Sequence, residues 1–347
     1  YNMDGTADYV TMKHIWNEVA NLIASGKADL VAMGRALLAD PFLPAKLAEG
    51  RDDEILTCIG CNEGCTGMLN ECRPISCALN PRTGYEDDYP MTQADAPKTV
   101  VVIGGGPAGC EAALTAAQRG HKVVLFEASP SLGGLANIAA LPPGKGVFAT
   151  LGAYFSAMLP RAGVDVRLNT KADADAVRTL NPDHVIVATG GAPIVPRFCA
   201  DAPVVLAQDI LTGTAQAGSR ALVIGGGLVG SETAEFLAEK GCEVTIVELR
   251  DGIALDMEYK TRQMLMPKLA ALGVVCLTET EVLEIGCNGN VKVKTPYLEK
   301  ELSGFDTVVV ALGYRPDTAL CADLAAAGID FVRVGDCKKV GKIINGV

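Results

Sequence analysis

Aromatic side chains and positive charge are both scarce in this sequence. Phe, Tyr and Trp make up 5% of the 347 residues, which argues against an aromatic-rich β-sandwich. The 30 basic residues are outnumbered by 41 acidic ones, and the net charge of −11 argues against a nucleic-acid-binding protein, which needs a basic patch. No apolar run approaches the roughly 18–20 residues of a membrane span. We therefore expect neither a nucleic-acid partner nor membrane insertion.

A secretory signal peptide is also missing from the start of the sequence, where Tyr1 opens an element that already lies mid-fold. We expect a cytoplasmic protein, and a piece of a longer chain or its ordered portion. In a reducing compartment, the 12 cysteines favour a metal or cluster site over disulfides.

The residues that are abundant point to α/β domains. Hydrophobic residues make up 49% of the chain, charged residues 20%, and Gly numbers 38. This length usually divides into about two or three domains with sizeable cores.

Four cysteines follow one another at C-x2-C-x3-C-x11-C spacing. They are Cys58, Cys61, Cys65 and Cys77. Four thiolates at short spacing hold either zinc or an iron–sulfur cluster. Zinc sites usually pair two C-x2-C motifs, so this spacing favours [4Fe–4S], with zinc and buried free thiols as alternatives. Cys72 is a second candidate for the fourth ligand, although Cys77 is the better anchor.

The segment before the cysteines predicts the end of a (β/α)8 barrel. Residues 14–24 have helical apolar spacing, Gly26 is a plausible stop, and residues 28–33 form a short buried strand by composition. Gly34 and Arg35 follow. Late loops of such barrels often bind phosphate, which a guanidinium holds bidentately. A surface arginine is the alternative interpretation of Arg35.

A dinucleotide-binding fingerprint follows a polar linker over residues 85–97. Its strand is Thr99–Ile103, its helix 111–119 and its second strand Lys122–Phe126. The fingerprint residues are Gly104, Gly106, Pro107, Ala108, Gly109 and Glu127. The glycines permit a tight turn, close approach to a pyrophosphate and close helix–strand packing, while the acid binds ribose hydroxyls.

The same pattern recurs 121 residues later, so the chain contains an internal repeat. Strands Arg220–Ile224 and Glu243–Val247 flank the fingerprint residues Gly225, Gly227, Gly230 and Glu248. In both copies the first glycine and the acid are 23 residues apart. Glu248 should repel a 2′-phosphate, which favours NADH over NADPH. Arg250 weakens that inference, because it could pair with such a phosphate.

Further glycine turns follow predicted strands and are candidates for contact with bound nucleotides. The candidates are Gly134 and Leu135 in a glycine turn, Thr189 and Gly190 at the end of strand 183–189, Gly313 after strand 307–312, and Gly335 and Asp336 after strand 331–334. For Gly335 and Asp336, an ordinary turn is the alternative interpretation.

Together these motifs resemble the C-terminal portion of iron–sulfur flavoenzymes of the old-yellow-enzyme type. This group includes 2,4-dienoyl-CoA reductase, trimethylamine dehydrogenase, and anaerobic enoate and bile-acid enone reductases. The resemblance covers nearly all of residues 28–347. It rests on AMGRALLADPFLPAKLAEGR at 32–51, the cysteine spacing, GGGPAG, GGGLVG and VGD.

The resemblance implies an α/β fold of glutathione-reductase type. Residues 1–57 would end an FMN-binding barrel, and residues 58–96 would form the iron–sulfur segment and linker. Residues 97–203 and 318–347 would form the FAD domain, with an NAD(P)H domain inserted at 204–317. Gly34 and Arg35 would contact FMN phosphate, the four cysteines would hold [4Fe–4S], and the first and second fingerprints would bind FAD and NAD(H).

The implied activity passes electrons from NADH through FAD and [4Fe–4S] to FMN, which reduces an activated C=C bond. The substrate would be a small 2-enoate, enoyl-CoA or enone, and the catalytic residues would lie in the barrel. Alternatives are an NADH:acceptor reductase module resembling the small subunit of glutamate synthase, an amine dehydrogenase, and an ADP-binding scaffold. The sequence leaves open whether the protein is a homo-oligomer.

Overall fold

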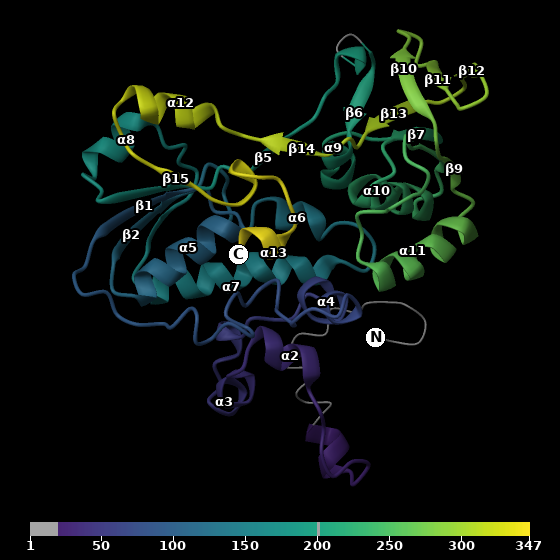
Figure 1. Cartoon of the computed structure of the whole chain (residues 1–347). Coiled ribbons are helices and arrows are strands. Elements are labelled where there is room, and N and C mark those ends of the chain that lie inside the picture. Colours follow the sequence, from purple (N-terminus) through teal and green to yellow (C-terminus); the bar gives the residue numbers. More distant parts are fainter. Residues whose placement is uncertain (1–19, 200–201) are drawn as a thin grey trace. The chain divides into compact units, whose positions relative to one another are not determined.

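The structure is a computed structural model that describes residues 20–199 and 202–347, and it divides into two compact units (Figure 1). Among the described residues, the first unit contains 20–140, 144–191 and 316–347, and the second contains 141–143 and 192–315. The chain therefore leaves the first fold and returns to it. The crossing falls at residues 191–192, whereas the sequence placed it at 203–204. The chain crosses between the units at β5 (Gly191–Pro193) and crosses back at β14 (Tyr314–Pro316). These two strands pair with each other as a two-stranded sheet.

The first unit is built on a five-stranded parallel sheet in the order β15-β4-β1-β2-β3. The strands are β1 (Thr99–Ile103), β2 (Lys122–Phe126), β3 (Asp165–Arg167), β4 (His184–Val187) and β15 (Val332–Arg333). Both predicted fingerprint strands are confirmed residue for residue. Parallel strands covered on both faces read as continuous apolar runs, which explains why their sequences are easy to recognise.

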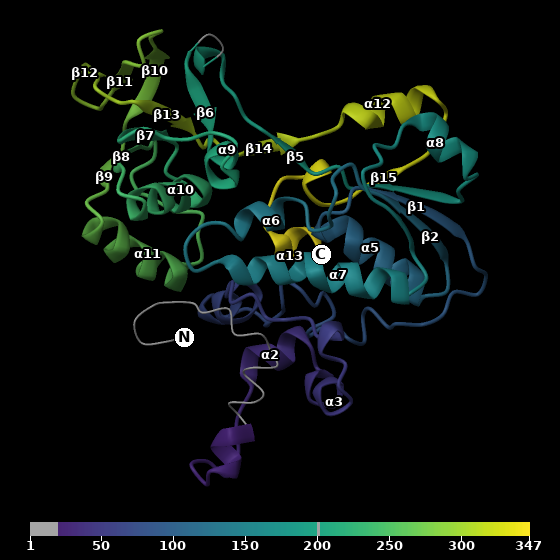
Figure 2. The same cartoon turned by 180° about the vertical axis from the view of Figure 1, so that it is seen from behind.

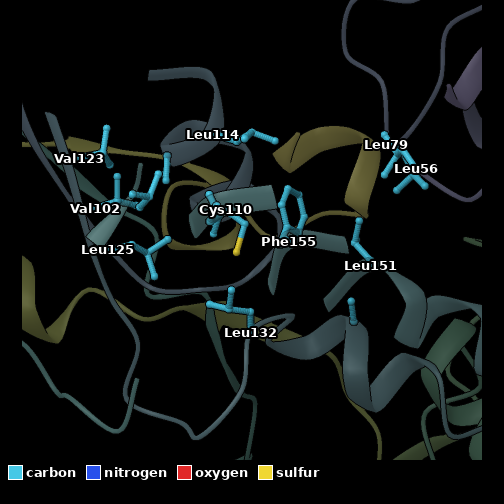
Figure 3. Packing of buried hydrophobic residues seen from close by; sticks show 14 of the residues in the cluster. Leu56, Leu79, Val102, Cys110, Leu114, Val123, Leu125, Leu132, Leu151 and Phe155 are labelled. Carbon is cyan, nitrogen blue, oxygen red and sulfur yellow. The ribbon is translucent and has the colours of Figure 1, made fainter. Parts of the chain in front are cut away.

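Helices cover both faces of this sheet. They are α5 (Pro107–Gln118), α6 (Leu135–Ala139), α7 (Ala149–Arg161), α8 (Ala174–Thr179), α12 (Ala319–Ala326) and α13 (Ile343–Gly346). Figures 1 and 2 show α5 and α7 together on one face, where Val102 and Leu125 of the sheet pack against Cys110 and Phe155 (Figure 3). The alternate sheet residues face α8 and α12.

The segment ahead of the sheet consists of short helices. Residues 20–24 are helical, followed by α2 (Gly34–Ala39), α3 (Leu43–Ala48), the turn Asp52–Glu54, the π-helical turn Glu63–Gly67 and α4 (Met68–Asn70). The predicted helix over 14–24 lies mostly outside the described residues. The predicted strand over 28–33 is wrong, and Leu30 there is 88% exposed. A strand needs a hydrogen-bonded neighbour, and none of the described strands pairs with this segment.

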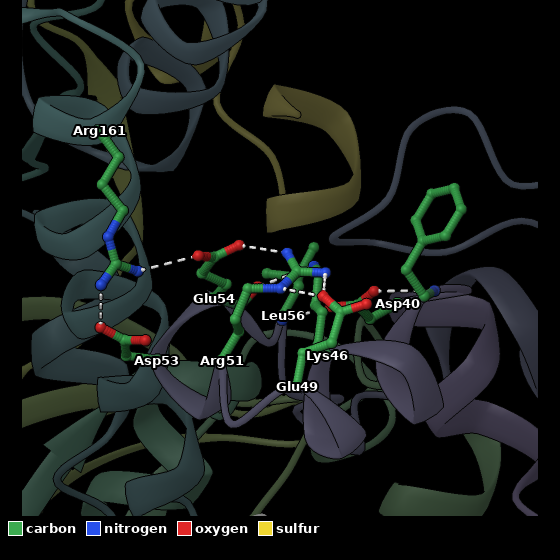
Figure 4. Close-up of polar contacts among 9 residues, drawn as sticks. Asp40, Lys46, Glu49, Arg51, Asp53, Glu54, Leu56 and Arg161 are labelled. Carbon is green, nitrogen blue, oxygen red and sulfur yellow. Dashed lines mark hydrogen bonds and ion pairs between the residues drawn. The ribbon is translucent and has the colours of Figure 1, made fainter.

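Polar contacts stabilise this segment internally and join it to α7 (Figure 4). Asp40 is buried and accepts hydrogen bonds from Leu56 N at 2.9 Å and Lys46 Nζ at 2.7 Å. Arg161, the last residue of α7, forms ion pairs with Asp53 and Glu54. These contacts hold the chain just ahead of the first cysteine.

The second unit repeats the first sheet with the order β6-β13-β7-β8-β9. Its strands are β6 (Val204–Leu206), β7 (Arg220–Ile224), β8 (Glu243–Val247), β9 (Val275–Leu277) and β13 (Thr307–Val310), all parallel. Its helices are α9 (Ala207–Thr212), α10 (Leu228–Glu239) and α11 (Tyr259–Ala271). An antiparallel sheet is added, with β10 (Glu281–Ile285), β11 (Val291–Lys294) and β12 (Glu299–Leu302). The internal repeat read from the sequence is therefore a structural repeat.

The helices of the described ranges are all too short or too polar to cross a membrane.

Candidate functional site

The four predicted cysteines line a single pocket in the first unit. Its lining includes Cys58, Cys61, Cys65 and Cys77 together with Arg35. Cys72 is exposed and absent from the lining, in a left-handed backbone conformation with φ of 55°. The pocket lining thus contains Cys77 rather than Cys72, and a cluster held by the four lining cysteines stays a prediction.

A backbone contact explains how the distant fourth cysteine reaches the other three. The amide of Ser76 donates to the carbonyl oxygen of Gly64 at 2.7 Å, which places the residue before Cys77 against the loop between Cys61 and Cys65. A Cβ on Gly64 would lie 2.8 Å from the Ser76 carbonyl. Only glycine allows this close approach.

Burial keeps two of these thiols neutral. It raises the pKa of Cys61 to about 12 and also raises the pKa of Cys77. A thiol in such surroundings becomes a thiolate only when a cation stabilises it. Cys61 and Cys77 therefore have little capacity for nucleophilic chemistry as free thiolates.

Two neighbouring residues of the cysteine loop have partners far away in the sequence. The guanidinium of Arg35 donates to Asn62 Oδ1 at 2.6 Å, and Lys342 Nζ contacts Glu63 Oε1 at 2.7 Å. Arg35, predicted to contact FMN phosphate, thus reaches the cysteine pocket in this structure. Asn62, Glu63 and Lys342 were not predicted from the sequence, where the only local signal is their polarity near or beyond the motif residues.

The first glycine fingerprint forms a tight turn between β1 and α5. Gly104 has φ of +113°, and a Cβ there would lie 2.2 Å from the Ala188 carbonyl oxygen. A Cβ on Gly109 would lie 2.0 Å from the Gly104 carbonyl oxygen. At Gly106, no described heavy atom lies within 4 Å of the Cβ position. The turn is therefore closed against its own helix and open where a pyrophosphate is expected.

The acid at the end of β2 supports this turn. Glu127 accepts hydrogen bonds from the amides of Gly105 at 2.6 Å and Ser129 at 2.7 Å. Its carboxylate therefore holds the glycine turn against the β2 end.

The other predicted residues of the first unit gather around the fingerprint. A Cβ on Gly134 would lie 3.0 Å from Gly106 Cα, and one on Gly335 would lie 2.7 Å from Ala108 Cβ. Leu135 begins α6 and Pro107 begins α5. Asp317 contacts two of the predicted residues: its carbonyl oxygen accepts from the Thr189 hydroxyl at 2.8 Å, and its amide donates to Gly190 O at 3.0 Å. Asp336 Oδ1 accepts from the amide of Gly341 at 3.0 Å. Gly134, Thr189 and Gly335, from three parts of the sequence, thus lie close to the fingerprint turn.

A partly buried acid on α5 gives a pH-dependent prediction. Burial raises the pKa of Glu111 from 4.5 to about 6, although Thr115 donates a hydrogen bond to its carboxylate. Between these values the folded state binds the proton more tightly, so stability is greater below pH 4.5 and falls as the pH rises through about 6. We expect Glu111→Gln to stabilise the protein at pH 7 by about 2 kcal/mol and to have little effect at pH 4.5. Unfolding of variant and wild type at matched pH checks this, and a pH-independent difference would contradict it.

The second fingerprint repeats the geometry of the first. Gly225 has φ of +100°, and a Cβ on Gly230 would lie 1.8 Å from the Gly225 carbonyl oxygen. Glu248 is buried and accepts from the amides of Gly226 at 2.6 Å and Arg250 at 2.8 Å. Gly313 lies just beyond the end of β13. The predicted residues of this fingerprint are therefore also brought together.

One acidic residue distinguishes the two copies. Asp256 Oδ1 accepts from the amide of Leu228, the first residue of α10, at 2.8 Å. It also lies 3.9 Å from the guanidinium of Arg250, which is 3.6 Å from Glu248. Sequence reasoning missed Asp256, because the motif spacing ends at Glu248.

Comparison with known proteins also indicates a nucleotide-binding oxidoreductase. The profile of the pyridine nucleotide-disulphide oxidoreductase family matches residues 55–178 and 98–336. An NADH oxidase of Thermoanaerobacter brockii is 44% identical over 94% of this chain and 51% of its own length. A bilirubin reductase of Mediterraneibacter gnavus is 40% identical over 93% of this chain and 50% of its own.

A solved structure is similar across nearly the whole chain. The complex of 2-naphthoyl-CoA reductase with 2-naphthoyl-CoA superposes with a TM-score of 0.89 at 32% identity, covering 98% of this chain and 55% of that one. The chain thus spans about half the length of the relatives it matches. It belongs to the pyridine nucleotide-disulphide oxidoreductase family, as the C-terminal FAD/NAD portion of iron–sulfur flavoenzymes of the old-yellow-enzyme type.

Proposed function

We propose that this chain is the electron-input portion of an NADH-dependent flavin and iron–sulfur oxidoreductase that reduces an activated C=C bond. The observation that carries the proposal is the pocket lined by Cys58, Cys61, Cys65 and Cys77, in the same compact unit as the first nucleotide fingerprint. When bound, FAD would accept hydride from NADH, and the cluster and FMN would supply one-electron transfer and delivery to the substrate.

The chain's own residues would bind and orient these groups. The open face at Gly106 leaves room for the FAD pyrophosphate, and Glu127 lies where ribose hydroxyls are expected. In the second unit, Glu248 would disfavour a 2′-phosphate. Arg250, the residue that could have favoured NADPH, lies between the carboxylates of Glu248 and Asp256. This arrangement supports NADH as the donor.

The cysteine pocket suits a cluster better than a single ion. A tetrahedral zinc site places its sulfur atoms about 3.8 Å apart. Within the described ranges, no group of three or more His, Cys, Asp or Glu side chains is arranged to hold one metal ion. The observation that favours [4Fe–4S] is the C-x2-C-x3-C-x11-C spacing of the cysteines that line the pocket.

The substrate class is inferred from the relatives. The names bilirubin reductase and 2-naphthoyl-CoA reductase both indicate reduction of unsaturated molecules. Our proposal is therefore a small unsaturated substrate, bound outside the residues of this chain. The name NADH oxidase favours a second candidate, an NADH:acceptor reductase module that passes electrons to a partner.

Flavin analysis of the natively purified protein tests the proposal. We expect FAD, acid-labile sulfide with iron, and bleaching of the flavin absorbance by NADH without oxygen. Equal amounts of FAD and FMN would support the C=C reductase, whereas FAD alone would support the module serving a partner. A colourless protein that contains zinc, or ADP without flavin, would contradict both.

A further inference from the structure

We propose that Asp256 is an internal anion that stands in for the coenzyme pyrophosphate at the start of α10 and is displaced when the coenzyme binds. This inference rests on the proposed function of the second fingerprint as the NAD(H) site. It adds a residue that restrains coenzyme affinity and selectivity without being part of the fingerprint.

The internal repeat provides a direct comparison. Position 106 of the first copy corresponds to position 227 of the second. A Cβ on Gly106 would meet no described atom within 4 Å, whereas one on Gly227 would lie 3.2 Å from an Asp256 carboxylate oxygen. The face that is open in one fingerprint is therefore covered by a carboxylate in the other.

The residue that follows this glycine also differs between the two fingerprints, and again only the second copy contacts Asp256. The first residue of α5 is Pro107, which has no amide hydrogen, while the first residue of α10 is Leu228. The additional N–H points to Asp256 Oδ1 at 2.8 Å. An amide in the first turn of a Rossmann helix is where a pyrophosphate oxygen binds. Asp256 thus satisfies a donor that the coenzyme would otherwise use.

The positive charge of Arg250 is a second interaction that holds the Asp256 carboxylate in place. The guanidinium of Arg250 lies 3.9 Å from Asp256 and 3.6 Å from Glu248. Asp256 is about half exposed, at 49%, so its side chain has room to turn towards solvent. A dinucleotide must replace one negative charge by two at the same helix end. Displacement of Asp256 would also free Arg250 on one side, where it could meet a 2′-phosphate.

Calorimetric titration of the complete protein with non-reducing ligands tests this inference. The variant is Asp256→Asn, which keeps an oxygen acceptor for Leu228 but removes the charge. We expect NAD⁺ and ADP-ribose to bind about three- to tenfold more tightly than to wild type. NADP⁺ should gain more, because Arg250 loses one of its two acidic partners.

A matched control removes a charge from the other end of the same helix. Glu239, the last residue of α10, is exposed, and Glu239→Gln should leave all three affinities unchanged. Asp256→Ser provides a second uncharged variant if the first folds poorly, and its circular dichroism is compared with wild type.

The outcomes separate this inference from the function on which it rests. Wild type that binds neither NAD⁺ nor ADP-ribose would overturn the proposed coenzyme site, and with it this inference. Wild type that binds both, with unchanged or weaker binding by the folded uncharged variants, would overturn the displaced-anion role alone. Equal gains in the Glu239→Gln control would reduce the effect to net charge and would also overturn it.

Discussion

Replacing Cys61 with alanine is expected to abolish NADH-driven reduction of the substrate by the complete protein, while NADH still bleaches its FAD. Cys61 is half-buried and lines the cysteine pocket beside three other cysteines. A four-cysteine cluster that loses one ligand is incomplete, so we expect loss of iron and labile sulfide. The first fingerprint turn around Gly104 and Glu127 is formed by other residues, so flavin binding should persist.

Cys72→Ala is the matched control for this experiment. Cys72 lies in the same stretch of sequence but is exposed and is not part of the pocket lining. This variant should keep its iron, labile sulfide and substrate turnover. Persistence of turnover in the Cys61 variant, with its iron lost, would show that electrons do not need the cysteine site.

Alanine at Gly109 should destabilise the first unit, alanine at Gly106 should leave its folding unchanged, and both should prevent FAD binding. At Gly109 the new Cβ would lie 2.0 Å from the Gly104 carbonyl oxygen and 3.1 Å from Ala188 Cβ, so the turn must open. We expect a loss of about 3 kcal/mol or more of stability in the first unit. At Gly106 the methyl group meets no described atom within 4 Å, so folding should be unchanged.

The reason for FAD loss differs between the two variants. Gly109→Ala distorts the turn itself, whereas Gly106→Ala places a methyl group in the space where the pyrophosphate approaches. Flavin content after desalting and the thermal midpoint of each apoprotein check the pair. Full FAD occupancy in Gly106→Ala would contradict the placement of the pyrophosphate at this turn.

The sequence correctly predicted the strands that flank the two glycine fingerprints. Strands β1, β2, β7 and β8 begin and end where expected, because each is a mainly apolar run that leads directly into a glycine turn or an acid. The predicted strand over 28–33 failed because its hydrogen-bonded neighbours are not among the described strands. Apolar composition alone cannot supply a partner.

The sequence by itself determined the chemistry available: two glycine turns, each with an acid 23 residues beyond its first glycine, and a set of closely spaced cysteines. Only the tertiary structure decided which groups meet. It places Cys77 rather than Cys72 in the lining of the cysteine pocket, since the Ser76–Gly64 backbone contact folds the intervening loop back. It also placed Asp256 at the start of α10, next to Leu228. The spacing of residues in the sequence predicts which side chains are close in space only within regular helices and strands. The position of Cys77 and the Asp256–Leu228 contact both depend on irregular loops, whose paths are set by packing.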